Sequence, residues 1–302
     1  HEAVTYGAKT AAALGSECVA LTLGEVEDAG DLGRFGASKV YNIDAPELTA
    51  FDSSVYTAAI AGAAKSLGAK IIVLLHNSTG KNLVGRLSAR LDAGSAPGVN
   101  SIPSVTGGEF KVRKAVFSGK AFADVTIKTD YKVISLAGNS IPVEESGSAV
   151  NVESLSVDLP APKTKVIETK RAEGITPLPE AELVVSGGRG LKGPENWGVI
   201  EDLAEVLGAT MACSRPVADV KRRPHHQHVG QTGVANSPNV YISAGISGAI
   251  QHLAGVNSSK TIVVVNTDAE APFFKAADYG VVGDLFEVLP RLTEAVKKYK
   301  NA

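Results

Sequence analysis

The residues best suited to ligand chemistry lie in the second half of the chain, where polar or glycine-rich clusters follow short apolar segments. There are five such clusters, at residues 186–190, 214–215, 245–248, 266 and 283–284. If the apolar segments are parallel strands, their carboxyl ends line one edge of a sheet, where open α/β proteins bind ligands. A single cluster is explained equally well by cap or turn chemistry. The five together, with Arg215 among them, favour one ligand site.

The glycine-rich segment GISGAIQH at 245–252 passes directly from an expected strand into an expected helix. Its backbone amides and the positive end of the helix dipole would face an anion such as a pyrophosphate. A serine nucleophile in a G-x-S-x-G turn would require glycine at 249, where Ala249 stands. The segment therefore predicts a phosphate cradle and gives no support to a serine hydrolase.

A second glycine motif has the spacing Gly188-x-Gly190-x-x-Gly193 and also lies between an expected strand and an expected helix. This is the context of a dinucleotide fingerprint. The NAD form carries an acidic residue about 20 positions further on, whereas this chain has Ser214 and Arg215 there. Because arginine can bind a 2′-phosphate, an NADP-dependent oxidoreductase is an alternative reading of these residues.

Histidines 225, 226 and 228 occur in a basic loop that ends in GQTG at 230–233. Neighbouring histidines rarely share one metal ion, and no cysteine or carboxylate lies close in sequence, so we predict a solvated loop and no metal site. The two glycines of GQTG let the backbone approach a ligand, while the glutamine and threonine offer an amide and a hydroxyl. The same four residues could equally form a turn.

The elements that would position these residues follow from hydrophobic periodicity. In the second half we expect a helix beginning near Pro194, strands at 183–185, 210–213, 240–244, 261–265 and 279–282, and a last helix at 285–298. In the first half we expect helices at 3–14, 53–67 and 82–92, strands at 18–23 and 70–75, and then neighbouring short strands, arranged as hairpins, at 110–117, 121–127 and 132–136.

These patterns predict an α/β protein of two domains, each a mostly parallel sheet flanked by helices. Length agrees, since 302 residues is about twice a typical domain. The charged, proline-containing stretch at 160–179 is typical of a connector, so the domains are expected at 1–176 and 177–302. The chain opens inside a helical pattern at His1, which predicts that an N-terminal piece with a first strand is missing.

Composition excludes several classes of function. A net charge of -2 gives no positive field for nucleic acid. Cys18 and Cys213 have no metal or redox spacing and are expected to be reduced thiols. No apolar run approaches the ~20 residues that span a bilayer.

Six ordered blocks of the second half carry a resemblance to a known family: ELVVSGGRGLK at 182–192, CSRPV at 213–217, VGQTG at 229–233, GISGAIQHLAG at 245–255, TIVVVNTDAEAPFF at 261–274 and ADYGVVGDLFEVLP at 277–290. In these blocks the chain resembles the alpha subunit of the electron-transfer flavoprotein. The first half resembles the nucleotide-hydrolase-like α/β domain of that family through YGAKTAAALG at 6–15.

The resemblance implies an FAD bound by a Rossmann-like second domain, with no catalytic residue because the protein would relay electrons. The FAD contacts that it implies are Arg189, Ser214, Arg215, Val229, Gly230, Gln231, Thr232, Ser247, Gly248, Ala249, Ile250, Gln251, His252, Asn266, Asp284 and Leu285. Three of them would tune the flavin: Arg215 against the isoalloxazine, Thr232 at N5 and His252 near O2.

Charge explains why such tuning residues would matter. Reduction places negative charge on a flavin largely removed from water, which burial disfavours. A unit charge about 4 Å away, at an effective dielectric of about 20, is worth on the order of 4 kcal/mol, or roughly 0.17 V per electron. Arg215 is always protonated, whereas His252 contributes most if it is charged.

The resemblance also implies partners. These are an electron-transfer flavoprotein beta subunit that holds AMP or a second flavin, soluble donors such as acyl-CoA dehydrogenases, and a membrane quinone oxidoreductase as acceptor. The expected compartment is the bacterial cytoplasm, with the mitochondrial matrix as the alternative. A structural partner subunit without a cofactor is a third hypothesis, beside the NADP-dependent enzyme that uses Gly188, Gly190, Gly193 and Arg215.

Overall fold

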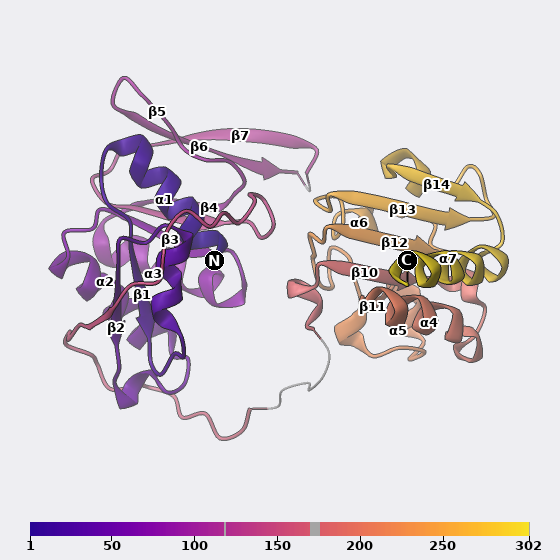
Figure 1. Ribbon diagram of the computed structural model, residues 1–302, viewed down its shortest axis with the longest axis horizontal. Coiled ribbons are helices and arrows are strands. Elements are labelled where there is room, and N and C mark those ends of the chain that lie inside the picture. Colours follow the sequence, from indigo (N-terminus) through magenta and orange to yellow (C-terminus); the bar gives the residue numbers. More distant parts are fainter. Residues whose placement is uncertain (118, 170–175, 302) are drawn as a thin grey trace. The chain divides into compact units, whose positions relative to one another are not determined.

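A computed structural model describes residues 1–117, 119–169 and 176–301. The chain divides into two compact units, His1–Thr169 and Lys170–Ala302, which we call unit 1 and unit 2 (Figure 1). The predicted division lies near residue 176; residues 170–175 of the expected connector lie outside the described residues. Both units are α/β with predominantly parallel pairing, which confirms the predicted fold class.

Unit 1 contains two sheets. Three parallel strands form the smaller one in the order β1-β2-β9, with bounds Val19–Leu23, Lys39–Ile43 and Val152–Ser154. The larger sheet has the order β3-β8-β4-β6-β5 with β7 beside β6; the bounds are Ile71–Leu75, Lys132–Leu136, Gly94–Val99, Glu109–Val116, Ser104–Thr106 and Ala121–Ile127. The helices of this unit are α1 (Glu2–Leu14), α2 (Ser53–Ser66) and α3 (Ser78–Leu91).

The expectation of hairpins after residue 109 is partly wrong. Strands β6 and β7 form the expected antiparallel hairpin. Strand β8, however, lies between β3 and β4 and is parallel to both. Its side chains from Val133 to Leu136 are all buried, which fits a central parallel strand rather than a hairpin arm with one wet face.

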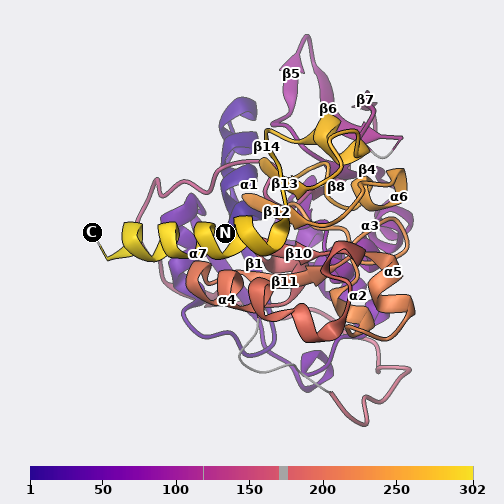
Figure 2. The same ribbon diagram turned by 90° about the vertical axis from the view of Figure 1, so that its right-hand side faces the viewer.

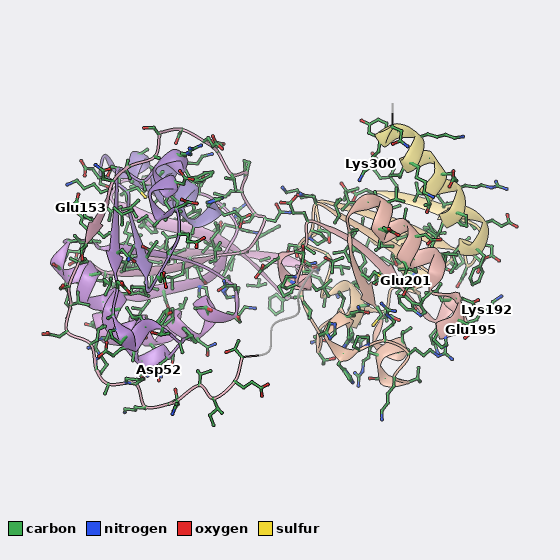
Figure 3. All side chains as sticks on the ribbon, turned by 60° about the horizontal axis from the view of Figure 1, so that its bottom comes forward. Asp52, Glu153, Lys192, Glu195, Glu201 and Lys300 are labelled. Carbon is green, nitrogen blue, oxygen red and sulfur yellow. The ribbon has the colours of Figure 1, made fainter. Side chains whose placement is uncertain are left out.

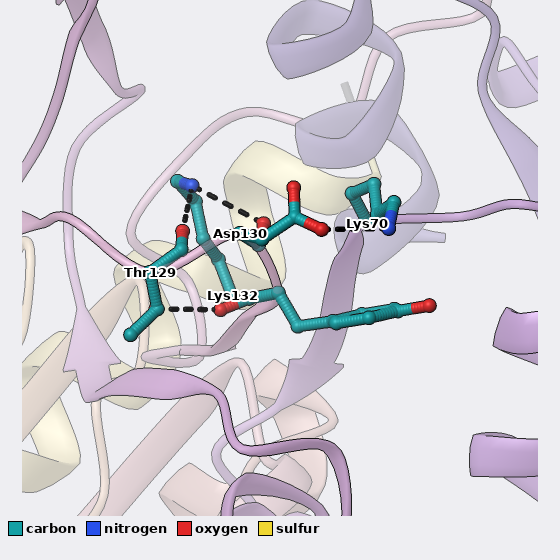
Figure 4. Close-up of polar contacts among 5 residues, drawn as sticks. Lys70, Thr129, Asp130 and Lys132 are labelled. Carbon is teal, nitrogen blue, oxygen red and sulfur yellow. Dashed lines mark hydrogen bonds and ion pairs between the residues drawn. The ribbon is translucent and has the colours of Figure 1, made fainter.

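Polar groups of the turn itself and of Lys70, directly before β3, hold the turn that leads into β8 (Figure 4). Lys70 Nζ lies 2.7 Å from Asp130 Oδ2 and 4.2 Å from the centre of the Tyr131 ring. Lys132 Nζ donates to the carbonyl groups of Thr129 and Asp130. Both lysines therefore serve the turn, and this cluster is structural.

Unit 2 contains one parallel sheet in the order β11-β10-β12-β13-β14. The bounds are Thr210–Cys213, Leu183–Gly187, Val240–Ala244, Thr261–Asn266 and Tyr279–Val282, and all five strands were predicted. In chain order the strands run 2-1-3-4-5, a doubly wound arrangement whose order reverses between β10 and β12. The carboxyl ends of β10 and β12 thus form the topological switch point.

Two helices cover one face of the unit 2 sheet (Figure 2): α4 (Gly198–Leu207) and α7 (Leu285–Lys300). Ile200, Leu203 and Leu289 are fully buried there against strand residues such as Val185. Glu201 of α4 and Lys300 of α7, labelled in Figure 3, are exposed, as expected for amphipathic helices.

The opposite face has a different cover. The short helices α5 (Arg215–Asp219) and α6 (Ile250–Leu253), together with loops, supply it. Here Tyr241 and Val264 of the sheet pack with Val229, Ile246 and Phe273, and the candidate site is built on this side.

Candidate cofactor site

The loops after β10 and β12 meet backbone to backbone at the switch point. Gly188 N donates to Ala244 O at 2.9 Å, and Gly190 N donates to Gly245 O at 3.0 Å. A Cβ at 188 would lie 2.2 Å from Gly245 O, and one at 190 would lie 2.7 Å from Gly245 Cα. These glycines are required by the contact between the two loops.

This contact weakens the dinucleotide-fingerprint reading. In such a fingerprint the glycines let the backbone approach a pyrophosphate and lead straight into a helix. Here Gly188 and Gly190 approach a neighbouring loop, and α4 begins only at Gly198, after a 3-10 turn over Pro194–Asn196.

The loop after β12 carries a row of free backbone donors. Within the described residues, no backbone carbonyl accepts from the N–H groups of residues 246–249. Gly245 at φ 63° and Gly248 at φ 81° turn this segment through the left-handed region. Consecutive N–H groups in such a turn form an anion-binding concavity. Helix α6 is a single short turn, so the anion site predicted at 245–252 rests on these N–H groups more than on a helix dipole.

The VGQTG loop lies between the end of β11 and α6. Val229 N donates to Cys213 O at 3.1 Å, and Gln231 N donates to Gln251 O at 2.7 Å. Gly230, at φ 149°, lies so close to the backbone of α6 that a Cβ would lie 3.0 Å from Gln251 O. The Gln231 and Thr232 side chains are exposed, so both are accessible to a ligand.

His252 is the buried polar residue of α6. Its side chain packs edge-on against Phe273, with ring centroids 5.6 Å apart, and its Nε2 lies 2.9 Å from Tyr241 Oη. Nδ1 is buried and has no hydrogen-bond partner among the described residues. Burial lowers the pKa of His252 to about 4, with His228 acting in the same direction, so the ring is neutral at pH 7.

Arg215 begins α5, and its side chain is exposed. Its Nε lies 3.2 Å from Asp219 Oδ2, one turn along the helix. An exposed pair of this kind contributes little to stability, so the guanidinium can exchange Asp219 for a ligand at small cost. Ser214, directly before it, is buried, and its N–H donates to Gly187 O at 3.1 Å.

Asn266 and Asp284 have internal partners. Asn266 Nδ2 donates to Ile246 O at 3.0 Å, and its Oδ1 accepts from Asp268 N at 3.0 Å. Asp284 caps α7, since its Oδ1 accepts from Phe286 N at 2.9 Å. Leu285 is buried and packs against Gly245, where an added Cβ would lie 2.8 Å from Leu285 Cδ2. The side chains of Asn266 and Asp284 thus brace the edge of the site, and their contact with a cofactor stays a prediction.

All the predicted site segments converge at the carboxyl edge of the unit 2 sheet. The backbone and side-chain contacts above join the segments at 188–190, 214, 229–231, 245–252, 266 and 284–285. Arg189 is exposed on the loop after β10, and Ser247, Ala249 and Ile250 are exposed on the loop after β12. The site is therefore continuous along one edge of unit 2.

The basic loop before VGQTG is less solvated than predicted. Arg223 lies 4.7 Å from the Trp197 ring and 3.0 Å from Glu201 Oε1, so it packs onto α4. His228 is buried, which lowers its pKa. His225 and His226 are exposed as expected, and the described residues hold no group of three or more metal-ligating side chains.

The polar residues beneath the site were not predicted from the sequence. Tyr241 is fully buried on β12, and the hydroxyls of Ser186 and Ser243, in register on β10 and β12, are buried without hydrogen-bond partners among the described residues. One signal was available. A tyrosine in a doubly buried strand needs a partner for its hydroxyl, which predicts a polar group nearby.

The fold and the candidate site together define a doubly wound α/β protein whose switch point carries a row of free backbone N–H donors, a chemistry suited to an anion. Among the described residues, no helix has the length and apolar character to cross a membrane. Residues 1–160 match the electron transfer flavoprotein domain, and residues 177–257 match the electron transfer flavoprotein FAD-binding domain.

Individual relatives agree. The chain is 40% identical over 273 residues to the electron transfer flavoprotein subunit alpha of Bacillus subtilis, covering 89% of this chain and 83% of that protein. It is 35% identical over 291 residues to the subunit alpha of Syntrophomonas wolfei, covering 94% and 91%. It is 36% identical over 248 residues to protein FixB of Escherichia coli, covering 80% and 79%. The chain belongs to the electron transfer flavoprotein alpha-subunit family.

Proposed function

We propose that this chain binds FAD along the carboxyl edge of the unit 2 sheet and serves as an electron carrier that transforms no substrate of its own. The observation that carries the proposal is the row of free N–H donors at residues 246–249, placed at the switch point beside a buried, unpartnered His252 Nδ1. The donors suit a pyrophosphate, and the ring nitrogen suits a polar atom of the flavin.

The residues divide into those that hold the cofactor and those that tune it. The backbone at 229–231 and 246–249 would bind and orient it. The first segment is fixed by hydrogen bonds to Cys213 of β11 and to Gln251, and the second accepts hydrogen bonds from Asn266 and Phe273. Arg215 would supply positive charge beside it. His252 would supply a hydrogen bond rather than a charge, since burial holds its pKa at about 4. When bound, FAD supplies the redox chemistry that no side chain of the site provides.

We propose that the complete carrier is a heterodimer with an electron-transfer flavoprotein beta subunit, which would hold AMP or a second flavin. Two relatives are named as subunit alpha, which supports a second subunit. Electrons would arrive from acyl-CoA dehydrogenases and related soluble enzymes and leave to a membrane quinone oxidoreductase. We propose the bacterial cytoplasm as its compartment, and the bacterial sources of these relatives support it over the mitochondrial matrix.

The test uses the chain co-expressed with its beta partner. The purified complex should be yellow and should release FAD on denaturation; a colourless complex that binds NADPH would support the oxidoreductase instead, and one that binds neither would support a structural subunit. Ala249→Pro sharpens the test, because φ at Ala249 is -54°, within the range that proline adopts, and the change removes the N–H donor of residue 249. FAD should bind roughly tenfold more weakly or worse. An unchanged FAD dissociation constant would show that the N–H groups of residues 246–249 do not bind the cofactor.

A further inference from the structure

The polar residues beneath the site form a connected cluster. Tyr241 and Ser186 lie on neighbouring strands β12 and β10 and face the same side of the sheet, and His252 lies over them in α6. Each has 6% or less of its surface exposed. We call these three residues the Tyr241 cluster. Of these three residues, only His252 is among the cofactor contacts predicted from the sequence.

The Tyr241 hydroxyl has one geometrically sound partner. Its oxygen lies 2.9 Å from His252 Nε2. Burial raises the pKa of Tyr241, so the group remains a phenol with one hydrogen to donate. Ser186 Oγ, on the neighbouring strand, has no hydrogen-bond partner among the described residues. Nε2 is the one hydrogen-bond partner that the described residues give the phenol, so we infer that the phenol hydrogen is directed to it.

A neutral imidazole that accepts at one nitrogen carries its hydrogen on the other. Since Nε2 accepts from Tyr241, the hydrogen of His252 belongs on Nδ1. This nitrogen is buried and has no hydrogen-bond partner among the described residues. The backbone of Val229 lies close enough to the ring to favour its protonated form, so the VGQTG loop adjoins His252. An unsatisfied buried donor costs free energy that a ligand acceptor would recover.

We propose that Tyr241 is a positioning residue: by donating to Nε2 it fixes His252 in the Nδ1–H form, so that the ring presents a buried N–H donor to the bound flavin. The proposal rests on the proposed function for the identity of the acceptor. The tautomer itself is a property of this chain without a cofactor.

The first experiment measures the tautomer by ¹⁵N NMR of the histidine side chains in the cofactor-free full chain. In wild type, His252 should carry its hydrogen on Nδ1, and Tyr241→Phe should give a mixture of both forms. Tyr6→Phe is the matched control, since Tyr6 is also 0% exposed but has no hydrogen-bond partner for its hydroxyl among the described residues. Nε2–H in wild type, or an unchanged tautomer in Tyr241→Phe, would overturn the proposal.

The second experiment measures FAD dissociation from the complex with the beta partner. Tyr241→Phe should weaken FAD binding by the inverse of the fraction of His252 that stays in the Nδ1–H form, about twofold for an even mixture, while Tyr6→Phe should leave it unchanged. His252→Asn keeps an amide donor near the position of Nδ1 whatever the tautomer. Adding Tyr241→Phe to that variant should cause no further loss, and a full additional loss would show that Tyr241 does not act through His252.

The two experiments distinguish a failure of the proposed function from a failure of the proposal for Tyr241. If the wild-type complex binds no FAD, the proposed function is wrong, and the NMR result still decides the tautomer. Fluorescence of Trp197, the single tryptophan of the chain, confirms in each variant that unit 2 is folded.

Discussion

Gly248→Ala tests whether the close contact between the loop after β12 and the segment at Phe273 maintains the candidate site. Gly248 has φ 81°, and a Cβ there would lie 2.5 Å from Phe273 Cβ and 2.6 Å from its Cα and N. Those atoms belong to or adjoin the backbone, and Phe273 N also donates to Ser247 O at 3.1 Å. The segment cannot move aside without losing that bond.

The matched control is Gly208→Ala at the end of α4. Gly208 has φ 70°, so alanine meets the same left-handed strain, but nothing lies within 4 Å of the added Cβ. The strain alone costs roughly 1–2 kcal/mol. The collision at Phe273 adds about 1–3 kcal/mol. Gly248→Ala should therefore be the less stable variant by that additional amount, because the change in unfolded-chain entropy is the same in both.

The assay is urea unfolding of the full chain followed by the fluorescence of Trp197. This residue is 3% exposed within unit 2, so its emission reports the unfolding of that unit. Gly248→Ala should also weaken FAD binding in the complex with the beta partner, since it displaces the donor row. If both variants lose the same free energy of unfolding within about 0.5 kcal/mol, the contact is not rigid and the reasoning fails.

Three further predictions concern the site and its core. Arg215→Ala should lower the midpoint potential of the bound flavin, by at most about 0.17 V because the side chain is exposed. Arg215→Lys retains the positive charge and should keep most of the wild-type potential. Equal potentials for wild type and Arg215→Ala in a redox titration would show that Arg215 does not tune the flavin. The folded pKa of His252 is depressed to about 4, so the unfolded chain binds more protons below pH 6.5. Stability should thus fall as the pH drops from about 6.5 to about 4, by about 3 kcal/mol in all, and urea unfolding of His252→Asn should show a smaller loss; an equal loss would assign the titration elsewhere. Leu289→Ala should cost about 2–5 kcal/mol in the same unfolding assay, because Leu289 is fully buried between α7 and the sheet, and a loss under 1 kcal/mol would show that the cavity refills.

The strands of the second half could be predicted because each depends on a pattern of neighbouring residues. Each strand of unit 2 is a short apolar run bounded by turn residues, and three of the five have the predicted bounds. A parallel sheet buried on both faces needs such runs, and its carboxyl ends collect the polar residues. The strands of the first half were harder to predict from the sequence. Strand β4 contains Gly94, Pro97 and Gly98, which argue against a strand, yet pairing with β8 and a local irregularity accommodate them.

The amino-acid sequence by itself determined the α/β class, the parallel order of strand and helix in unit 2, and the edge at which a ligand would bind, because hydrophobic period and turn chemistry are properties of neighbouring residues. Only the tertiary structure decided that β8 is inserted between β3 and β4, that Gly188 and Gly190 meet the backbone at Gly245, and that His252 is neutral above a buried Tyr241. Each of these depends on contacts between segments distant in the chain, and burial and hydrogen bonding at such contacts set the protonation state that the isolated residue types leave open.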